Sequence, residues 1–423
     1  MKKIIFLLLF SLNSFLLLSQ RTCGTMDKLH ERMQADPAFA KRHQEMMSFI
    51  QDPNNPQTLF RQPNSPNIIV TIPVVFHVLY KNQAQNISDA QIQSQLDVLN
   101  KDFRKLNTDF TTVVPSVFRP LAADMEIVFC KATKTPSGVA TTGITRKQVS
   151  ASFDLINNYY DNTGELSWDP TKYLNIWIGR FLEDYILGQA LLPPNSGDQP
   201  YPGDGLVIGD QFFGTTGTAT TPPFNKGRTA THEIGHYFGL YHPWGRGFTD
   251  NSNCSDNDNS DLVNDTPAIN QAHYGCPAFP TNLNTCSSST NGAMYMNYMD
   301  YVDDACMAMF SNGQKTIVQN TLAGPRLSLL TSNGCGTLGL NDFQAINAIA
   351  VYPNPVSQYF MITSPQLAID EVEIYNTLGQ LLKTQKLTQS NNVINIEELA
   401  SGTYYLRIYN EGKFLKSDKV IKK

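Results

Sequence analysis

Apolar positions divide the first half of the chain into buried strands and one amphipathic helix. Residues 68–79 form an almost continuous apolar run, which is typical of a buried strand. A capping box made by Ser88 and Gln91 predicts the start of a helix. Apolar residues then follow on one helical face: Ile92, Leu96, Leu99, Phe103 and Leu106. Shorter strand-like runs at 125–130, 174–178 and 206–208 complete an alternation that predicts an α/β arrangement up to about residue 242.

The pattern changes twice after residue 242. The chain first becomes rich in Asn, Asp, Ser and Cys until the 290s, which indicates an irregular lower part. Residues 345–423 then carry short alternations of apolar and polar residues, such as Val372/Ile374 and Leu406/Ile408, with turn residues between them. Several short strands at this spacing predict a C-terminal all-β sandwich.

The first sixty residues differ from both parts. Lys2 and Lys3 precede an apolar run over residues 4–18, and polar residues follow. This pattern predicts a secretory signal peptide over residues 1–19. A membrane anchor is the alternative, which the short run disfavours. Residues 20–60 are too short for a core of their own and end in a Pro/Asn/Gln-rich stretch. We predict a pro-segment that docks on the next domain and is joined to it by an exposed linker.

Length, charge and cysteine usage narrow the class of protein. A chain of 423 residues is expected to form two or three domains. The net charge of −5, with both signs interspersed, argues against nucleic acid as a partner. Export implies oxidising surroundings, in which the seven cysteines can form disulfides. Four of them cluster: Cys254, Cys276, Cys286 and Cys306. Cys23, Cys130 and Cys335 are isolated, and the sequence leaves the pairing of the last two open.

The segment from residue 232 to residue 242 carries the chemistry. His232 and His236 are one helical turn apart, so both imidazoles project from the same face and suit one zinc ion. Glu233 follows the first histidine and can take a proton from the attacking water as general base. Gly239 lets the chain leave the helix and bring His242 back as a third ligand. Three protein ligands are typical of a catalytic zinc site.

The alternative is a chance cluster of histidines on an amphipathic helix. Only seven histidines occur in the chain, and three of them lie here with the glutamate and the glycine in place. The long form of the motif fixes five positions, which makes coincidence a poor explanation.

This long motif resembles that of the metzincin metalloproteases, whose second mark is a methionine turn beneath the zinc. Residues 297–301, with Met299 at their centre, are the candidate, whereas simple core filling explains the other methionines nearby. Both motifs, the Asp/Cys-rich loop and residues 299–306 together resemble the pappalysin family, especially its ulilysin-like branch. The resemblance covers about residues 67–325 and implies an α/β metzincin catalytic domain with a long active-site helix and an irregular lower subdomain, which we expect to span residues 61–335.

The resemblance also implies roles for single residues. Met299 would be the turn methionine, and Tyr301 would stabilise the oxyanion of the reaction. Asp304 would lie at the base of the S1′ pocket, so that bonds on the N-terminal side of Arg, and less of Lys, are hydrolysed. An ordinary surface acid is the alternative for Asp304. Sequence alone allows three pairings of the four clustered cysteines, and the resemblance implies Cys254–Cys286 and Cys276–Cys306.

The loop between residues 254 and 267 is crowded with carboxylates. Oxygen-rich ligands of this kind suit calcium, although the spacing is not that of an EF-hand. The candidate ligands are Asp256, Asp258, Asp261, Val263 and Asp265. A polar loop without an ion is the alternative, and the resemblance implies structural calcium.

Cys23 stands close to the expected mature N-terminus. A thiolate is a strong zinc ligand, so Cys23 could fill the open position on zinc and keep the enzyme latent, as in the cysteine-switch latency of other metzincins. At the other end, the Tyr352-Pro353-Asn354-Pro355 segment, the Gly402–Leu406 segment and the basic terminus resemble a type A sorting domain of type IX secretion. A carbohydrate- or collagen-binding sandwich is the alternative.

Together these features predict a secreted or surface-attached zinc endopeptidase made as a latent zymogen. Its partners would be protein or peptide substrates, its own pro-segment as inhibitor, and the secretion machinery, and we expect a monomer. A surface-attached binding protein with a degenerate protease domain is the rival. Cleavage before Arg would permit self-activation at Phe60–Arg61, with release of the sorting domain before Arg326 or near residues 334–336.

Overall fold

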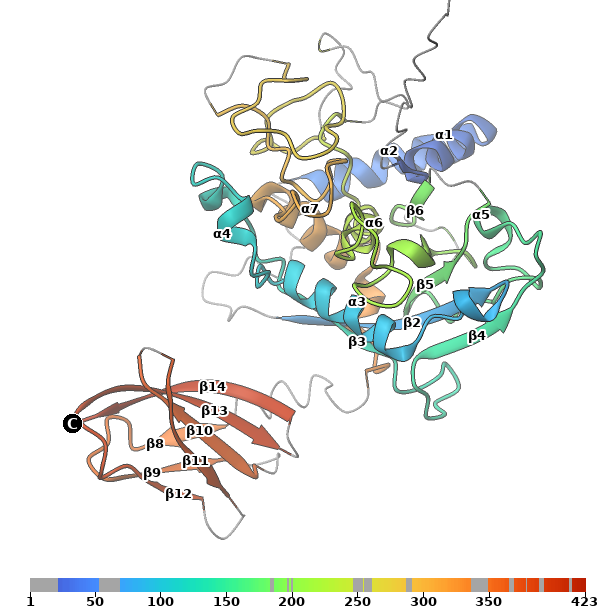
Figure 1. The fold of residues 1–423 in the computed structure, drawn as a ribbon. Coiled ribbons are helices and arrows are strands. Elements are labelled where there is room, and N and C mark those ends of the chain that lie inside the picture. Colours follow the sequence, from blue (N-terminus) through green and yellow to red (C-terminus); the bar gives the residue numbers. More distant parts are fainter. Residues whose placement is uncertain are drawn as a thin grey trace, which may run out of the picture. The chain divides into compact units, whose positions relative to one another are not determined.

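The computed structural model describes residues 22–52, 69–182, 186–195, 198, 201–245, 254, 261–286, 291–335, 349–364, 369–377, 379–387, 392–410 and 413–423. The chain divides into two compact units, Met1–Gly334 and Cys335–Lys423 (Figure 1). The predicted signal peptide, the bond Phe60–Arg61 and the calcium candidates Asp256 and Asp258 lie outside the described residues. Within these residues, no helix combines the length and the apolar character needed to span a bilayer.

One mixed sheet organises the first unit. Its strands are β1 (Thr22–Cys23), β2 (Val70–Tyr80), β3 (Ile127–Lys131), β4 (Ile144–Gln148), β5 (Leu174–Gly179), β6 (Ile186–Ala190) and β7 (Gly205–Gly209). They follow the order β1-β6-β7-β5-β2-β3, and β4 also pairs with β2. All pairs are parallel except β6 with β7. The four predicted strands are present, whereas β1, β4 and β6 were not predicted from the sequence.

The helices of this unit are α1 (Thr25–Ala35), α2 (Pro37–Gln51), α3 (Asp89–Asp102), α4 (Phe110–Val113), α5 (Leu155–Asn158), α6 (Arg228–Tyr237) and α7 (Asn312–Ala323). Short 3-10 turns lie at Gln83–Gln85, Arg119–Leu121, Asp210–Phe212 and Leu327–Thr331. The Ser88 hydroxyl caps α3 by accepting from Gln91 N at 3.2 Å, as the sequence predicts. The predicted apolar face is too long, however, because α3 ends at Asp102 and Leu106 is 64% exposed.

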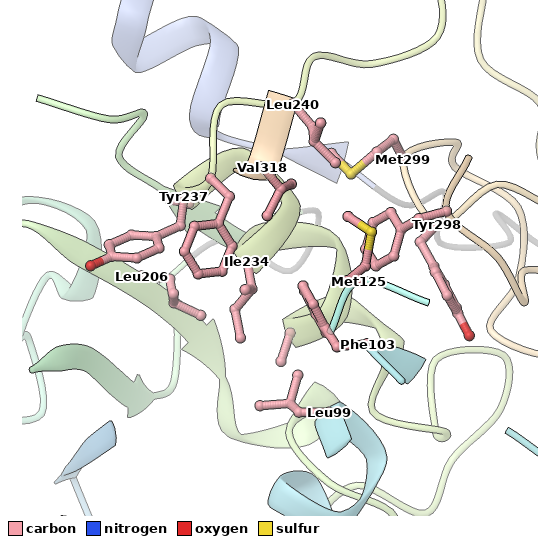
Figure 2. Packing of buried hydrophobic residues seen from close by; sticks show 14 of the residues in the cluster. Leu99, Phe103, Met125, Leu206, Ile234, Tyr237, Leu240, Tyr298, Met299 and Val318 are labelled. Atoms are coloured by element: carbon pink, nitrogen blue, oxygen red, sulfur yellow. The ribbon is translucent and has the colours of Figure 1, made fainter. Parts of the chain in front are cut away.

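The main core lies between the sheet and the helices α3, α6 and α7. Figure 2 shows Ile234 of α6 near Leu99 of α3 and near Phe103, the residue that caps the C-terminus of α3, and all three are buried. Helix α3 packs against α6 and β3, and α6 packs against β6 and β7. The active-site helix is therefore packed tightly against its apolar neighbours, which fixes the direction of its side chains.

The predicted pro-segment forms two helices that pack within the same unit. Asp36 caps α2 by accepting from Ala38 N and Phe39 N, with Pro37 in the first helical position. The buried face of α2 carries Phe39, His43, Met46, Met47 and Ile50. This face packs against α7, and Asn320 Nδ2 of α7 donates to Ile50 O at 2.8 Å.

The described residues between 261 and 310 form little regular structure, and disulfides stabilise this part of the chain. The structure pairs Cys254 with Cys286 and Cys276 with Cys306, which is the pairing implied by the resemblance. Cys130 and Cys335 are both disulfide-bonded, and Cys23 is a free thiol.

The second unit is built from two antiparallel sheets. One has the strand order β11 (Leu381–Lys386), β10 (Glu371–Tyr375), β13 (Gly402–Asn410), β14 (Lys413–Lys422). The other has the order β12 (Val393–Asn395), β9 (Tyr359–Thr363), β8 (Ala350–Tyr352). Their inner faces share one apolar core that includes Phe360, Val372, Leu406 and Ile408. The predicted fold class, an α/β domain followed by an all-β sandwich, is confirmed.

Candidate active site

Helix α6 brings three histidines together. His232 and His236 lie one turn apart on it, and the chain then reverses at Gly239, whose φ of +92° is in the left-handed region that favours glycine. This turn returns His242 to the same point. The Nε2 atoms of the three rings lie 3.2 Å (His232–His236), 3.0 Å (His236–His242) and 3.2 Å (His242–His232) apart, and all three residues are buried.

The hydrogen bonds of the rings set their tautomers. His232 Nδ1 lies 2.8 Å from Tyr298 O, and His236 Nδ1 lies 2.7 Å from Leu240 O. A carbonyl oxygen only accepts, so each Nδ1 carries the proton and each Nε2 presents a lone pair. Burial lowers the pKa of His236 to about 4, and burial with the neighbouring imidazoles lowers the pKa of His242 well below its usual value. The rings of His236 and His242 are therefore neutral at neutral pH.

This donor set fits zinc. Zn–N bonds of roughly 2.0–2.1 Å in a tetrahedral site place the nitrogens about 3.3 Å apart. The observed separations of 3.0–3.2 Å are close to that value. Three lone pairs that converge in a buried space repel one another unless a cation lies between them. The chemistry of the three rings therefore points to a bound metal ion.

Glu233 lies between the histidines and strand β6. It is buried, and its Oε2 accepts from Cys23 Sγ at 3.3 Å and from Thr25 Oγ1 at 3.0 Å. Gly188 of β6 makes room for it, because a Cβ at that position would lie 2.8 Å from Glu233 Cγ. Sequence reasoning did not single out Gly188, since a glycine in an unpredicted strand gives no signal of its own.

Met299 packs against α6 at Gly235 and lies next to Leu240 in Figure 2. Its backbone N–H donates to Asn297 Oδ1 at 2.9 Å, which closes the turn. Gly235 is the matching position on the helix, since a Cβ there would overlap Met299 Sδ. The sequence could have indicated this contact, because a glycine inside a helix costs about 1 kcal/mol and usually has a packing reason.

Tyr301 faces the histidines from the other side. Its ring lies 4.9 Å from that of His242, edge to face, and 4.8 Å from that of Trp244. His242 in turn stacks on Trp244 at 4.5 Å. The Tyr301 hydroxyl accepts from Cys23 N at 3.2 Å. The aromatic contacts aim this hydroxyl at the space next to the histidines.

The predicted pro-segment passes the histidine cluster at Cys23. Strand β1 pairs with β6 in parallel, with Cys23 opposite Gly188, and Gly24 N donates to Gly188 O at 3.0 Å. The metal-binding atoms of Cys23 and the three histidines all lie within 4.8 Å of one another. Burial and the charge of Glu233 raise the pKa of the Cys23 thiol, so its thiolate needs a cation at the histidines to form.

Asp304 is buried at the start of α6 and not on the surface. Its Oδ2 accepts from Lys226 N at 2.8 Å and from Arg228 N at 3.3 Å. Arg228 also donates to the backbone carbonyls of Asp304 and Met307. The Asp304 carboxylate therefore accepts hydrogen bonds from backbone N–H groups at the N-terminus of α6.

The calcium candidates that the structure describes have protein partners. Both carboxylate oxygens of Asp261 lie within 2.9 Å of Thr266 Oγ1, and Asp261 Oδ1 also accepts from Val263 N. Asp265 accepts from Ser311 Oγ at 2.6 Å and from Gly313 N at 2.9 Å, next to the N-terminus of α7. Among the described residues, Cys23 with the three histidines is the group that could hold a metal ion.

Comparison with known proteins agrees with this geometry. The family described as pregnancy-associated plasma protein-A, a peptidase family, matches residues 157–323. The chain is 30% identical over 248 residues to an extracellular metalloprotease of Arthroderma benhamiae, covering 58% of this chain and 74% of the relative. The chain belongs to this peptidase family. It is a secreted zinc metalloendopeptidase, because an intact motif within a family of metalloproteases excludes the degenerate alternative.

Solved structures of mirolysin from Tannerella forsythia are also similar. A mutant promirolysin has a TM-score of 0.62 and 37% identity, covering 73% of this chain and 97% of that chain. Mature mirolysin in complex with a cleaved peptide has a TM-score of 0.56 and 41% identity, covering 63% of this chain and 97% of that chain. Residues 350–423 match the family described as a secretion system C-terminal sorting domain, which places this metalloprotease outside the cell or on its surface.

Proposed function

We propose that the chain is the latent precursor of an endopeptidase whose zinc is held by His232, His236 and His242. The convergence of three Nε2 lone pairs beside the buried Glu233 carries this proposal. Zinc, when bound, supplies Lewis acidity that polarises the scissile carbonyl and acidifies the attacking water. Glu233 accepts the proton of that water and later passes it to the leaving amine. Tyr301 donates its hydroxyl hydrogen to the developing oxyanion.

Latency follows from how the pro-segment engages these same groups. Cys23 Sγ, close to the three histidines, would act as the fourth zinc ligand, and Thr25 Oγ1 donates to Glu233 Oε2. Cys23 N also engages the Tyr301 hydroxyl. Each of the three catalytic elements is therefore blocked by a separate contact from residues 23–25. The similarity to promirolysin supports a precursor of this kind.

Zinc content and turnover test the site. In Glu233→Gln the three histidines are unchanged, so we expect stoichiometric zinc by elemental analysis and a loss of casein hydrolysis of at least about 100-fold. Retention of near wild-type turnover in the zinc-loaded variant would remove Glu233 from the role of base. Loss of zinc in a folded His242→Ala variant is the complementary expectation, because two imidazoles hold zinc far more weakly than three.

The proposal includes a preference for Arg, and less for Lys, after the scissile bond. Its support is the burial of the Asp304 carboxylate at the start of α6, close to the catalytic helix. A guanidinium binds a carboxylate in a bidentate manner, whereas an ammonium is a point charge. Mapped cuts in a denatured proteome test this preference. Asp304→Asn should abolish the bias towards Arg, and apolar residues at that position in the wild-type cuts would exclude Asp304 as the pocket base.

Maturation at Phe60–Arg61 remains part of the proposal, and the cut before Arg326 does not. Arg326 is 2% exposed, and its guanidinium makes two hydrogen bonds of 2.9 Å to Asp204. It also lies 3.3 Å from the centre of the Tyr237 ring. A protease cannot reach a bond held in this way. We therefore place release of the sorting domain after Cys335. N-terminal sequencing of wild type and Glu233→Ala after equal incubation tests autolysis at Arg61.

Calcium and oligomeric state complete the proposal. The loop that contains Asp261, Val263 and Asp265, together with Asp256 and Asp258, is proposed to bind structural calcium, because its carboxylates crowd one short segment. A rise in unfolding temperature with added calcium, absent with magnesium, is the expected result. The enzyme is proposed to act as a monomer, which light scattering of the mature form measures.

A further inference from the structure

A buried His–Asp pair lies directly behind Tyr301. His273 and Asp300 are 1% and 0% exposed. His273 Nδ1 lies 2.7 Å from Asp300 Oδ2, and the His273 backbone N–H donates to Asp300 Oδ1 at 2.8 Å. The Tyr301 backbone N–H donates to the same Oδ1 at 2.7 Å. The Asp300 carboxylate therefore holds the backbone N–H of Tyr301 and both the backbone N–H and the imidazole ring of His273.

The ring of His273 is held at both nitrogens. Its Nε2 lies 2.9 Å from Leu283 O, which can only accept, so Nε2 carries a proton. Nδ1 faces the Asp300 carboxylate, which accepts when it is ionised. Both contacts are satisfied together by an imidazolium beside a carboxylate. The titratable groups that face His273 are Asp300, from the methionine turn, and Tyr295, whose ring centre is 6.3 Å away.

The pair joins two separate parts of the irregular region. His273 belongs to the segment that carries Cys276 and Cys286, whereas Asp300 belongs to the turn between Met299 and Tyr301. A further backbone bond links the same two segments three residues on, from Asp303 N to Gly275 O at 3.0 Å. The segment around His273 is therefore a support on which the Tyr301 turn rests.

We propose that His273 and Asp300 are positioning residues for the reaction, which act by holding the Tyr301 hydroxyl at the oxyanion position. This inference rests on the proposed role of Tyr301. Asp300 accepts directly from the Tyr301 backbone N–H, and the orientation of its carboxylate depends on His273. Loss of the imidazolium leaves a buried carboxylate without its charged partner, so the carboxylate and the turn reorganise.

The pair makes the reaction sensitive to pH. Burial alone lowers the pKa of His273, but the hydrogen bond and the charge of Asp300 outweigh it, so the pKa is raised above its usual value. A raised folded-state pKa means that the stabilisation is fully present below the unfolded value of about 6.5 and is lost as the pH rises through the folded value. We therefore expect kcat to fall on the alkaline side as His273 loses its proton.

The test is a double-mutant cycle on the mature, zinc-loaded enzyme, with Tyr301→Phe, His273→Gln and the combination of both. Below pH 6.5, His273→Gln should lower kcat about tenfold with less than a twofold change in KM, because a misplacement of the order of 1 Å can cost up to about 100-fold. In the Tyr301→Phe background the same substitution should change kcat less than twofold. The alkaline fall of the wild-type profile should be absent from His273→Gln.

A matched control separates positioning from general stability. His77 is also a fully buried histidine held at both nitrogens, by Thr145 Oγ1 at 2.8 Å and Asn175 Oδ1 at 3.0 Å in the sheet. His77→Gln should leave kcat and its pH profile unchanged. An equal loss of kcat in His77→Gln would overturn the inference, because the effect of His273→Gln would then be loss of stability. Where His273→Gln does not fold, Asp300→Asn replaces it in the cycle.

The cycle also separates the role of Tyr301 from the role of the His273–Asp300 pair. Wild-type kcat in Tyr301→Phe would remove Tyr301 from the proposed mechanism, whatever His273→Gln does. A low kcat in Tyr301→Phe that falls a further tenfold with His273→Gln would keep Tyr301 and overturn the role of the pair. A tenfold loss confined to the Tyr301 background supports the inference.

Discussion

Thr25 offers the sharpest test of latency. Its side chain is buried, its hydroxyl donates to Glu233 Oε2 at 3.0 Å, and it accepts from Ala190 N at 2.8 Å. Thr25→Val keeps the shape of the side chain and removes both hydrogen bonds. The variant leaves the catalytic carboxylate and an N–H of β6 without this partner, while Cys23 is untouched. We expect the pro-segment to hold the cleft less tightly.

The size of the effect follows from the two bonds. A hydrogen bond to a charged group contributes about 1.5–3 kcal/mol, and one between neutral groups about 0.5–1.5 kcal/mol. Together they amount to roughly 2–4 kcal/mol, since such contributions are not fully additive. At about 1.4 kcal/mol for each factor of ten, the open, active form of the uncut precursor should increase by about 30- to 700-fold.

The assay is the initial rate of hydrolysis of a quenched peptide by the intact precursor, with gels to show that no cut has occurred. Thr25→Ser is the matched control, because it keeps the hydroxyl and loses only a methyl group. It should stay as latent as wild type. If Thr25→Val is no more active than Thr25→Ser, the contact with Glu233 does not contribute to latency and the reasoning is refuted.

Three further predictions concern the site and its supports. Glu233→Ala should bind one zinc by elemental analysis and lose casein hydrolysis by at least about 100-fold. Turnover near that of the wild type would refute the role of Glu233 as general base. Arg326→Met should lower the free energy of unfolding, measured in urea, by about 3–5 kcal/mol, because Asp204 is left buried without its partner. Adding Asp204→Leu should restore most of this loss, and no recovery in the double variant would refute the explanation. Gly235→Ala should destabilise the protein by about 1–3 kcal/mol through overlap with the sulfur of Met299. In the Met299→Ala background the same substitution should increase the free energy of unfolding, which denaturant unfolding measures.

Much of the catalytic part could be predicted because its signals are local. The spacing of His232 and His236, the capping box at Ser88 and the apolar runs of the inner strands each depend on neighbours within a few residues. Leu106 shows the limit of such reasoning. It continues the apolar spacing of α3, but the helix ends at Asp102 and the side chain is exposed. Periodicity does not report where a backbone leaves its helix.

Contacts between distant segments could not be predicted. Strand β6 contains two small or polar residues, Gly188 and Gln189, and gives no strand signal, yet it pairs with the pro-segment and lies against Glu233. The pair of His273 and Asp300 joins positions 27 residues apart in a region without periodicity. Burial of Arg326 also escapes prediction, because a lone arginine in a Gly-Pro-Arg sequence is typical of an exposed turn. Each of these features depends on tertiary neighbours.

The disulfide between Cys276 and Cys306 has a mechanical consequence. It closes a loop of the chain that contains both Met299 and Tyr301. When the enzyme is pulled along its chain, as during secretion or attachment at a surface, the tension passes from one cysteine to the other through the covalent bond. This path bypasses the residues between the two cysteines, so the turn that holds Met299 and Tyr301 keeps its shape under force.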